Sequence, residues 1–258
     1  MDLELEGSVI LITGGSTGLG YALGERLVRE RARVALLARD AARLAHAVQQ
    51  LRGAGGDVLE LAGDVRQPQD LARFVDAARE RWGRIDGVVN NAGELSAGAF
   101  AEHDDAVWAR DLELKLMAAV RVIRLALPAL RESRGAIVNT LAISGKAPDA
   151  HTTPTSVSRA AGLALTKALS RELAPAGIRV NAVLIGVVES AQLERLAAAG
   201  GVTAQAYYER MVADCGIPLG RVGHPREYAD LASFLLSARA SYLTGAAINL
   251  DGGLCPVA

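Results

Sequence analysis

The stretch that decides the fold reads Val9-Ile10-Leu11-Ile12-Thr13-Gly14-Gly15-Ser16-Thr17-Gly18-Leu19-Gly20. Its first four residues are all apolar, which is typical of a strand covered on both faces, as strands of a parallel sheet are. The glycines that follow predict a tight turn, and helical spacing of apolar residues begins at about residue 18. The stretch therefore predicts a strand, a glycine-rich turn and a helix in immediate succession.

The same alternation continues along the chain. Nearly continuous apolar runs predict strands at 8–13, 33–38, 57–62, 85–90, 135–141, 178–184 and 245–250. Segments rich in Ala, Leu and Arg predict helices at 18–30, 41–53, 68–82, about 104–131, 154–174 and 225–237. Regular β-α alternation implies right-handed crossovers. The sequence therefore predicts an α/β protein: a single-domain Rossmann fold over 1–258, with a doubly wound parallel seven-stranded sheet and helices on both faces.

Local signals support these helices, and one segment departs from the alternation. Asp40 is a suitable N-cap for the second helix, and Gly83, Gly135 and Gly177 stand where helices stop. Residues 191–216 form a mostly helical insertion between the sixth strand and the last helix. A lid over a binding cleft would lie at this place in the fold.

Composition excludes several classes of function. The 258 residues carry a net charge of −1 with both signs interspersed, which argues against nucleic acid or membrane surfaces as partners. No apolar stretch approaches the roughly 18–20 residues that span a bilayer. The start Met1-Asp2-Leu3-Glu4 is acidic, unlike a signal peptide, so we expect a cytoplasmic protein. Two cysteines and four scattered histidines predict no disulfide framework and no metal site.

The glycine-rich turn predicts a nucleotide site. Gly14, Gly18 and Gly20 follow the spacing G-x-x-x-G-x-G, a variant of the dinucleotide-binding fingerprint. Such a turn lets the backbone approach a pyrophosphate, and the following helix supplies free N–H groups and a favourable dipole. Taken alone, the pattern also fits an ordinary strand-to-helix turn.

Further motifs occur in order after the turn. Asp64-Val65 ends the third strand, Asn90-Asn91-Ala92-Gly93 ends the fourth, Arg179-Val180-Asn181-Ala182-Val183 forms the sixth, and Asp251-Gly252-Gly253 closes the seventh. Together with T-G-x-x-x-G-x-G, they make the chain resemble the short-chain dehydrogenase/reductase family from about residue 6 to the C-terminus. This family binds NAD(H) or NADP(H), so the resemblance implies a nicotinamide cofactor.

The resemblance also implies which residues contact that cofactor. On the phosphate and adenine side these are Gly14, Ser16, Thr17, Gly18, Leu19, Gly20, Asp64 and Val65. In the middle of the groove and on the nicotinamide side they are Asn91, Ala92, Gly93, Gly186, Val188 and Ser190. Ile185 stands where the family usually has proline, a departure from the pattern beside the nicotinamide.

Residue 39 bears on the choice of cofactor. A carboxylate at the end of the second strand would bind a ribose 2′-hydroxyl and repel a 2′-phosphate. Here the strand ends in Arg39, which suits a 2′-phosphate through charge-assisted hydrogen bonds. We therefore expect NADP(H) rather than NAD(H). In the alternative, Arg39 is solvated and Asp40 faces the ribose.

The family's catalytic Asn-Ser-Tyr-Lys set is where the resemblance fails. The corresponding positions hold Lys115, Ala142, Thr155 and Arg159. A shifted alignment does not restore the tyrosine, because the tyrosines lie at 21, 207, 208, 228 and 242. Threonine does not ionise usefully at neutral pH, and arginine holds ribose hydroxyls but is a poor proton donor. General acid–base help is worth about 10²–10⁴-fold, so unassisted ketone reduction should be slow.

Few residues could replace the missing proton donor. Lys115 borders the family's active site, and burial lowers the pKa of a lysine; alternatively, Lys115 fills the asparagine's space and bonds backbone carbonyls. We therefore take Lys115, Thr155 and Arg159 as the candidate catalytic residues, with Arg159 also contacting the cofactor. Other candidates near the site are Ser144, Lys146, Asp149, His151, Tyr207 and Tyr208, the two tyrosines lying in the insertion, where they could equally anchor it.

Three functions remain open on the sequence. The first is an NADP(H)-dependent oxidoreductase for a small carbonyl, enone or imine, since activated C=C and C=N acceptors need little acid help. The second is a non-redox lyase, isomerase or cyclase, and the third is a catalytically silent subunit. Ala142, Ile143, Leu184 and Ile185 suggest an apolar pocket and a hydrophobic substrate. The resemblance implies a homotetramer or homodimer.

Overall fold

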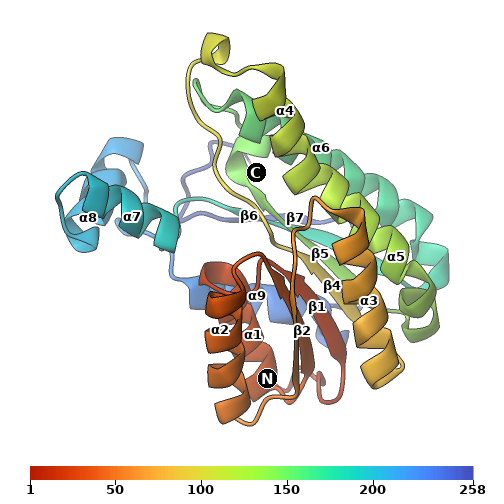
Figure 1. Cartoon of the computed structure of the whole chain (residues 1–258). Helices are drawn as coiled ribbons and strands as arrows, with labels where there is room; N and C mark the ends of the chain where they lie inside the picture. Colours follow the sequence, from red (N-terminus) through yellow and green to blue (C-terminus); the bar gives the residue numbers. More distant parts are fainter. Residues whose placement is uncertain (258) are drawn as a thin grey trace.

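The computed structural model describes residues 1–257 and contains one parallel seven-stranded sheet in the order β3-β2-β1-β4-β5-β6-β7 (Figure 1). The strands are β1 Val9–Thr13, β2 Arg33–Ala38, β3 Val58–Ala62, β4 Gly87–Asn90, β5 Ala136–Ala142, β6 Arg179–Ile185 and β7 Ala247–Leu250. The order reverses between β1 and β4, and this is the crevice where doubly wound folds bind ligands. The expected single-domain Rossmann fold is confirmed.

Helices cover both faces of the sheet (Figure 1). On one face lie α1 Gly18–Arg29, α2 Ala41–Gly53 and α9 Pro225–Leu236. On the other lie α3 Pro68–Trp82, α4 Asp105–Leu112, α5 Ala118–Ser133 and α6 Thr153–Glu172. Short connections complete the chain: a π-helical turn at Glu113–Met117 and 3₁₀ turns at Phe100–Glu102, Ile143–Gly145, Ala174–Ala176 and Ala238–Ala240.

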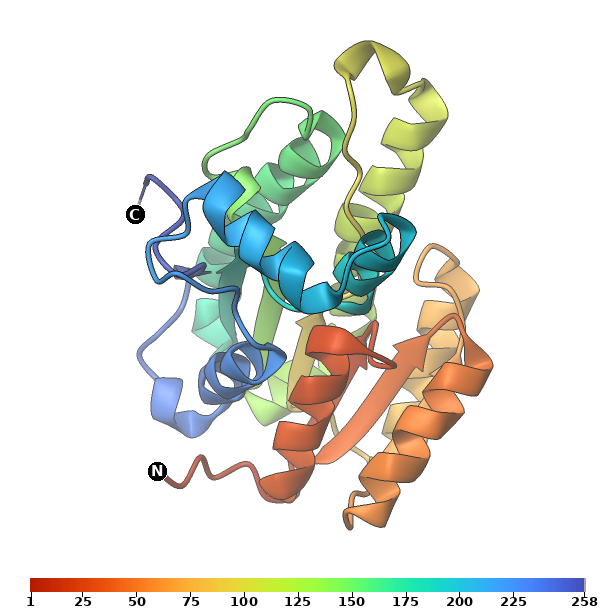
Figure 2. The same cartoon turned by 90° about the vertical axis from the view of Figure 1, so that its left-hand side faces the viewer.

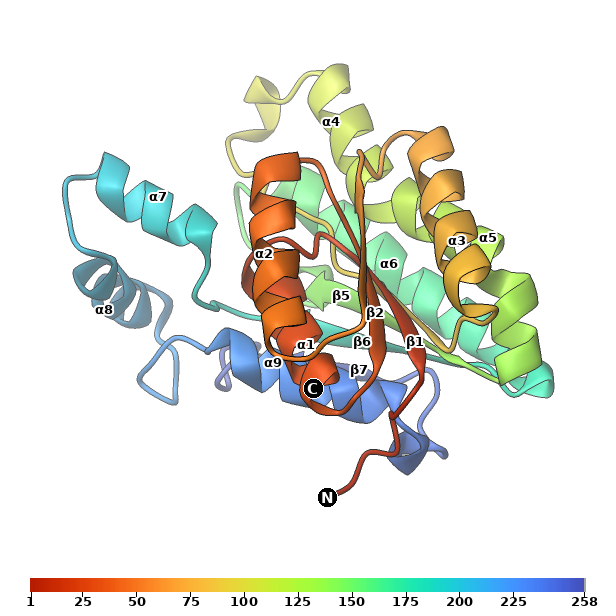
Figure 3. The ribbon, with the colours of Figure 1, turned by 60° about the horizontal axis from the view of Figure 1, so that its bottom comes forward.

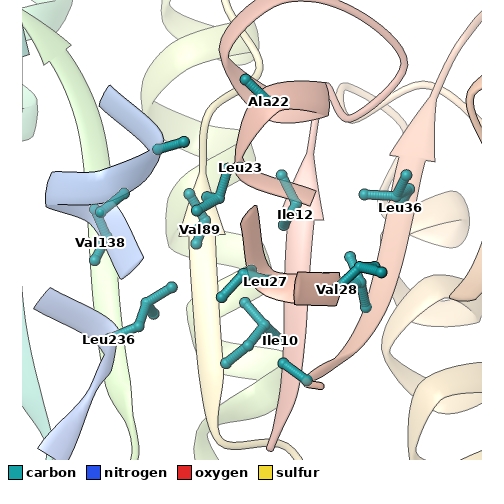
Figure 4. Close-up of a cluster of buried hydrophobic side chains, with 14 of the residues drawn as sticks. Ile10, Ile12, Ala22, Leu23, Leu27, Val28, Leu36, Val89, Val138 and Leu236 are labelled. Carbon is teal, nitrogen blue, oxygen red and sulfur yellow. The ribbon is translucent and has the colours of Figure 1, made fainter. Parts of the chain in front are cut away.

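The apolar run of β1 is continuous because its two faces pack into two different cores. Ile10 and Ile12 meet α1 and α9, where they lie beside Leu23 and Leu27 of α1 (Figure 4). Leu11 faces the opposite core, formed with α3 and α5. Each fully buried Leu or Ile side chain stabilises the fold by about 1.5–3 kcal/mol, so this strand anchors both layers.

The glycine-rich turn is shaped by contacts that a side chain would block. Gly14 has φ +71°, in the left-handed region that glycine adopts without strain. A Cβ on Gly20 would lie 2.3 Å from the carbonyl oxygen of Gly14. The first turn of α1 therefore packs directly on the loop that precedes it, which keeps the start of α1 at the carboxyl end of β1.

Most predicted elements agree with the structure to within one or two residues. The expected helix at about 104–131 is interrupted, because the π-helical turn at Glu113–Met117 separates α4 from α5. Asp40 caps α2 as predicted, its Oδ1 accepting from the Arg43 N–H at 3.0 Å. Gly83 and Gly177 terminate helical segments in the left-handed conformation, whereas Arg134 takes that role before Gly135.

The insertion at 191–216 consists of two helices, α7 Ala191–Ala199 and α8 Ala204–Cys215. This helical pair projects away from the sheet (Figures 1 and 3). Figure 2 looks onto the pair and shows it between α1 and α4 in that view. A small apolar core of its own, with Tyr208, Ile217 and Val222 buried, joins it to the segment before α9. Within residues 1–257, no helix combines the length and the apolar character that crossing a membrane requires.

Candidate functional site

The carboxyl edge of the sheet holds the glycine-rich turn in a fixed shape. The Thr13 hydroxyl oxygen accepts from the backbone N–H groups of Asn91 and Ala92, both at 3.1 Å. The Asn91 side chain donates in return to the carbonyl oxygens of Thr13 and Gly14 at 3.0 and 3.1 Å. The end of β4 is thereby tied to the turn after β1, at the point where the strand order reverses.

The start of α1 fits a diphosphate. Its N-cap residue, Thr17, makes no side-chain capping bond, and the first turn of the helix contains no acidic residue. By contrast, Asp40 caps α2 with its own carboxylate. The first N–H groups of a helix lack partners within the helix and carry partial positive charge. The residues predicted to contact the phosphates, Ser16 to Gly20, therefore lie around backbone N–H groups that can donate hydrogen bonds to a phosphate.

Two arginines, Arg39 and Arg66, lie where the sequence predicts the adenosine side of the site. Arg39 follows β2 and is exposed. Arg66 follows β3 and donates to Asp64 Oδ2 from Nε at 3.0 Å and from Nη2 at 2.6 Å. The alternative in which Asp40 faces a ribose is not supported. Its carboxylate caps α2 and accepts from Arg43 Nε at 2.6 Å. Arg39 is thus the charged group that the end of β2 offers to a ligand.

Lys115 lies at the centre of a buried polar cluster. It projects from the π-helical turn, and its side chain is only 1% exposed. Its Nζ lies 2.8 Å from Asp111 Oδ2 and 2.8 Å from Thr155 Oγ1. The alternative in which Lys115 bonds backbone carbonyls is therefore wrong, because its partners are side chains. Sequence reasoning missed Asp111, although the i, i+4 spacing to Lys115 places the two residues on one helix face.

Thr155 connects this cluster to the loop that follows β4. Its Oγ1 accepts from Lys115 Nζ and from the Ser96 N–H at 2.9 Å, and it donates to the Ser96 carbonyl oxygen at 3.1 Å. Ser158 donates from its hydroxyl to Asp111 Oδ2 at 3.1 Å. The candidate catalytic residues Lys115 and Thr155 are thus in direct contact, and one carboxylate holds the cluster together.

Arg159 is buried beside the predicted cofactor groove. The residue is 9% exposed, and its Nη1 donates to the Thr140 carbonyl oxygen at 2.7 Å. A Cβ on Gly93 would lie 2.7 Å from Nη2, so the guanidinium borders a glycine that is predicted to contact the cofactor. Its Nε is buried and has no hydrogen-bond partner within residues 1–257. An orphaned buried donor at this place fits a hydroxyl-bearing ligand such as a ribose.

Burial shifts the acid–base properties of both cations. Burial, followed by repulsion from Arg159, lowers the pKa of Lys115 to about 8, although the Asp111 carboxylate opposes the shift. Burial likewise lowers the pKa of Arg159 to about 10, opposed by Asp111. At neutral pH both side chains are charged, and the pKa of Lys115 lies closer to neutral pH than that of Arg159.

The other candidates do not join this cluster through any contact that the structure records. Lys146 donates to the Ala247 carbonyl oxygen and to Asn249 Oδ1, at 3.1 and 2.9 Å. Tyr208 is buried in the core of the helical pair, with Tyr207 packed against that core, so both anchor the pair. Asp149 and His151 are exposed, and Ser144 is half-buried.

The residues predicted to lie beside the nicotinamide are in and near the turn after β6. Gly186 packs on Asp251, where a Cβ would lie 2.7 Å from the aspartate Cβ. Val188 pairs with Gly223 in an isolated β-bridge, and the Ser190 hydroxyl caps α7 by accepting from Leu193 N–H at 3.3 Å. Leu184, expected in the pocket, is instead fully buried in a core beneath the site. Among residues 1–257, no three His, Cys, Asp or Glu side chains are arranged to hold a metal ion.

Comparison with known proteins places this geometry among oxidoreductases. A family described as enoyl-(acyl carrier protein) reductase matches residues 14–255. A protein of Streptomyces violaceoruber, named as a ketoacyl reductase of the granaticin polyketide synthase, is 38% identical over 253 residues. The alignment covers 95% of this chain and 92% of that protein.

Two solved structures are similar over nearly their whole length. A short-chain oxidoreductase from Pseudomonas aeruginosa PAO1, described as containing an atypical catalytic center, has a TM-score of 0.92 with NADPH bound. It is 35% identical, with 97% of this chain and 98% of that one covered. L-Sorbose reductase from Gluconobacter frateurii, complexed with NADPH and L-sorbose, has a TM-score of 0.94 at 33% identity and full coverage of both chains. Both relatives were solved with NADPH.

Proposed function

Because this chain belongs to the short-chain dehydrogenase/reductase family, we propose that it is an NADP(H)-dependent oxidoreductase whose active site lacks the family's usual catalytic set. Its substrate is a small hydrophobic carbonyl, enone or imine. The observation that carries the proposal is the direct contact of Lys115 with Thr155, beside the orphaned guanidinium nitrogen of Arg159. Two of the family's catalytic positions thus hold a linked pair of polar groups, and a third holds a cation.

The preference for NADP(H) follows from the charges at the end of β2. Arg39 is exposed there, while the Asp40 carboxylate is occupied by α2 and Arg43. A guanidinium binds a 2′-phosphate through charge-assisted bonds. The two similar structures with NADPH support the same preference.

The protein's own contribution to the reaction is to bind, orient and supply a proton. When bound, the cofactor supplies a hydride to the acceptor carbon. The Thr155 hydroxyl then donates its proton to the acceptor heteroatom, after rotating it away from the Ser96 carbonyl oxygen. Lys115 Nζ returns a proton to Thr155 Oγ1 across their 2.8 Å contact. The neutral amine then regains a proton from solvent before the next turnover, which requires the buried cluster to open. The acceptor gains one hydride and one proton, so atoms and charge balance.

Arg159 and the helical pair complete this proposal. Arg159 holds cofactor ribose hydroxyls through Nε, and its charge lowers the proton affinity of Lys115. The pair α7–α8 follows the turn after β6 and would act as a lid over a substrate bound at the carboxyl edge of the sheet, where half-buried Ala142, Ile143 and Ile185 lie at the ends of β5 and β6. These apolar side chains favour a hydrophobic substrate. We further propose a cytoplasmic homotetramer or homodimer, as is usual for the family.

Titration calorimetry with NADPH and NADH, on wild type and on Arg39→Ala, tests the cofactor assignment. We expect micromolar NADPH affinity that weakens by about 1.5–3 kcal/mol without Arg39, the scale of a charged hydrogen bond. Binding of NADH should stay within about twofold. Wild-type protein that binds NADPH but consumes none with carbonyl, enone and imine substrates would refute the redox assignment.

The pH dependence of turnover tests the proton source. Lys115 has a pKa of about 8, so the protonated donor is present below pH 8 and is lost as pH rises through that value. We expect kcat for reduction to be flat from pH 6 to about 7.5 and to fall by about tenfold per unit above pH 8. A kcat that is constant from pH 6 to 10 would exclude Lys115 as the donor.

The burial of Lys115 also fits a second function, a catalytically silent subunit. Its side chain is 1% exposed, and the single proton of Thr155 is engaged with Ser96. A silent subunit would bind NADPH and never turn it over, and it would copurify with a tyrosine-bearing homologue. Activity of the homogeneous protein on any substrate of the panel removes this alternative.

A further inference from the structure

Four charged side chains meet on the adenosine side of the site, from the ends of three strands. Arg39 follows β2, Asp64 and Arg66 follow β3, and Glu94 follows β4. Arg66 and Asp64 form a close fork, with Nη2 2.6 Å from Oδ2. Arg39 Nη2 faces Glu94 Oε2 at the longer distance of 3.9 Å. The cluster thus contains two arginines and two carboxylates.

The two carboxylates differ in how firmly they are held. Asp64 makes three contacts with Arg66 and accepts the Arg66 N–H, so its charge is satisfied locally. The ion pair recorded for Glu94 is the one with Arg39, and both side chains are about half exposed, at 44% and 57%. Arg66 is also near enough for its charge to interact with Glu94. An ion pair as exposed as that of Glu94 and Arg39 is weak and exchanges its partner readily.

Contacts of the neighbouring residues restrain the backbone on both sides of Glu94. Two residues later, both backbone groups of Ser96 are bonded to Thr155 Oγ1. On the other side, Gly93 lies against the buried guanidinium of Arg159. A ligand phosphate at Arg39 is therefore expected to displace the Glu94 carboxylate by rotation of its side chain rather than by movement of the backbone.

We propose that Glu94 is a specificity-determining residue that competes with the adenosine 2′-phosphate for Arg39. This proposal rests on the proposed NADP(H) function. The Glu94 carboxylate cancels the charge that Arg39 offers, and a phosphate group must displace it against like-charge repulsion. Glu94 lowers the affinity for NADPH and leaves the affinity for NADH unchanged. It therefore reduces the ratio by which the protein prefers NADPH over NADH.

Two small probes isolate this effect from catalysis. Binding of 2′,5′-ADP, which carries the 2′-phosphate, is compared by calorimetry with binding of 5′-AMP, which lacks it. In Glu94→Gln we expect 2′,5′-ADP to bind about three- to fivefold more tightly, the scale of an exposed charge pair, with 5′-AMP unchanged. The gain should shrink between 0.05 and 0.5 M NaCl because salt screens exposed charges.

Two further variants serve as controls. Glu132→Gln removes the same charge from the exposed end of α5 and should leave both probes unaffected. The gain from Glu94→Gln should vanish in an Arg39→Met background, because the two effects act through one contact. Weaker or unchanged 2′,5′-ADP binding in Glu94→Gln overturns the proposal, as does an equal change for both probes.

Failure of the proposed function gives a different result. If wild type binds the probes and Glu94→Gln binds 2′,5′-ADP more tightly, but NADPH is never consumed, only the oxidoreductase assignment is lost. If NADPH is consumed and Glu94→Gln changes nothing, only the role of Glu94 is lost. If neither wild type nor Glu94→Gln binds 2′,5′-ADP, both proposals are overturned.

Discussion

Replacing Lys115 by methionine is expected to lower the free energy of unfolding by about 3–5 kcal/mol. The substitution keeps the length of the side chain and removes its charge. It leaves the Asp111 carboxylate, also 1% exposed, without the ammonium group it contacts, with the Ser158 hydroxyl as its remaining donor and Arg159 as a more distant cation. In a chain of 258 residues this corresponds to a fall in Tm of roughly 10 °C. Urea unfolding monitored by circular dichroism measures it directly.

The double variant Lys115→Met/Asp111→Leu tests whether the loss of stability comes from breaking the ion pair between the two residues. Removing both charges together restores most of the stability, because an apolar pair of similar volume replaces a buried ion pair at little cost. The difference between the single and double variants gives the coupling between the two residues. If Lys115→Met costs less than 1 kcal/mol, water reaches Asp111 and the cluster is not sealed.

Replacing Thr155 by valine is expected to lower kcat by about 10²-fold or more, the worth of a positioned proton donor. Valine matches the shape of threonine and lacks the hydroxyl that contacts Lys115 and that we propose as the proton donor. Affinity for NADPH should stay within about twofold, because Thr155 has no assigned cofactor contact. Stopped-flow measurement of absorbance at 340 nm separates the chemical step from product release.

Thr155→Ser keeps the hydroxyl and is the matched control, with kcat expected within about tenfold of wild type. Valine also leaves the Ser96 N–H and carbonyl without their partner, at a cost of about 1–3 kcal/mol, so activity is measured well below Tm. Unchanged kcat in Thr155→Val means that solvent protonates the product, and the reaction is then confined to acceptors that need no acid.

The fold could be predicted because its signals are local in sequence. The apolar run of β1, the glycines after it and the N-cap Asp40 each report on a few neighbouring residues, and all agree with one architecture. The interruption at Glu113–Met117 was missed, because the sequence there has ordinary helical spacing. The π-helical turn contains the buried Lys115 and follows the buried Asp111, and their contacts depend on tertiary structure.

The site could be predicted only in part, for a related reason. Lys115, Thr155 and Arg159 are candidates because of their places in a family pattern, and their roles stay predictions. Asp111 and Ser96 occupy places to which that pattern assigns no role. The contact of Thr155 with Ser96 joins residues 59 positions apart, and no periodicity reports on it. The Arg39–Glu94 pair likewise depends on which strands are neighbours across the glycine-rich turn.

The two hydrogen bonds between the Thr155 hydroxyl and the backbone of Ser96 limit how this site can evolve. A tyrosine at residue 155 would place an aromatic ring where the present side chain is 4% exposed and in contact with Lys115 and Ser96. A larger side chain at residue 155 therefore requires accompanying changes among the residues that Thr155 contacts, so the packing around this position limits which residues it can accept.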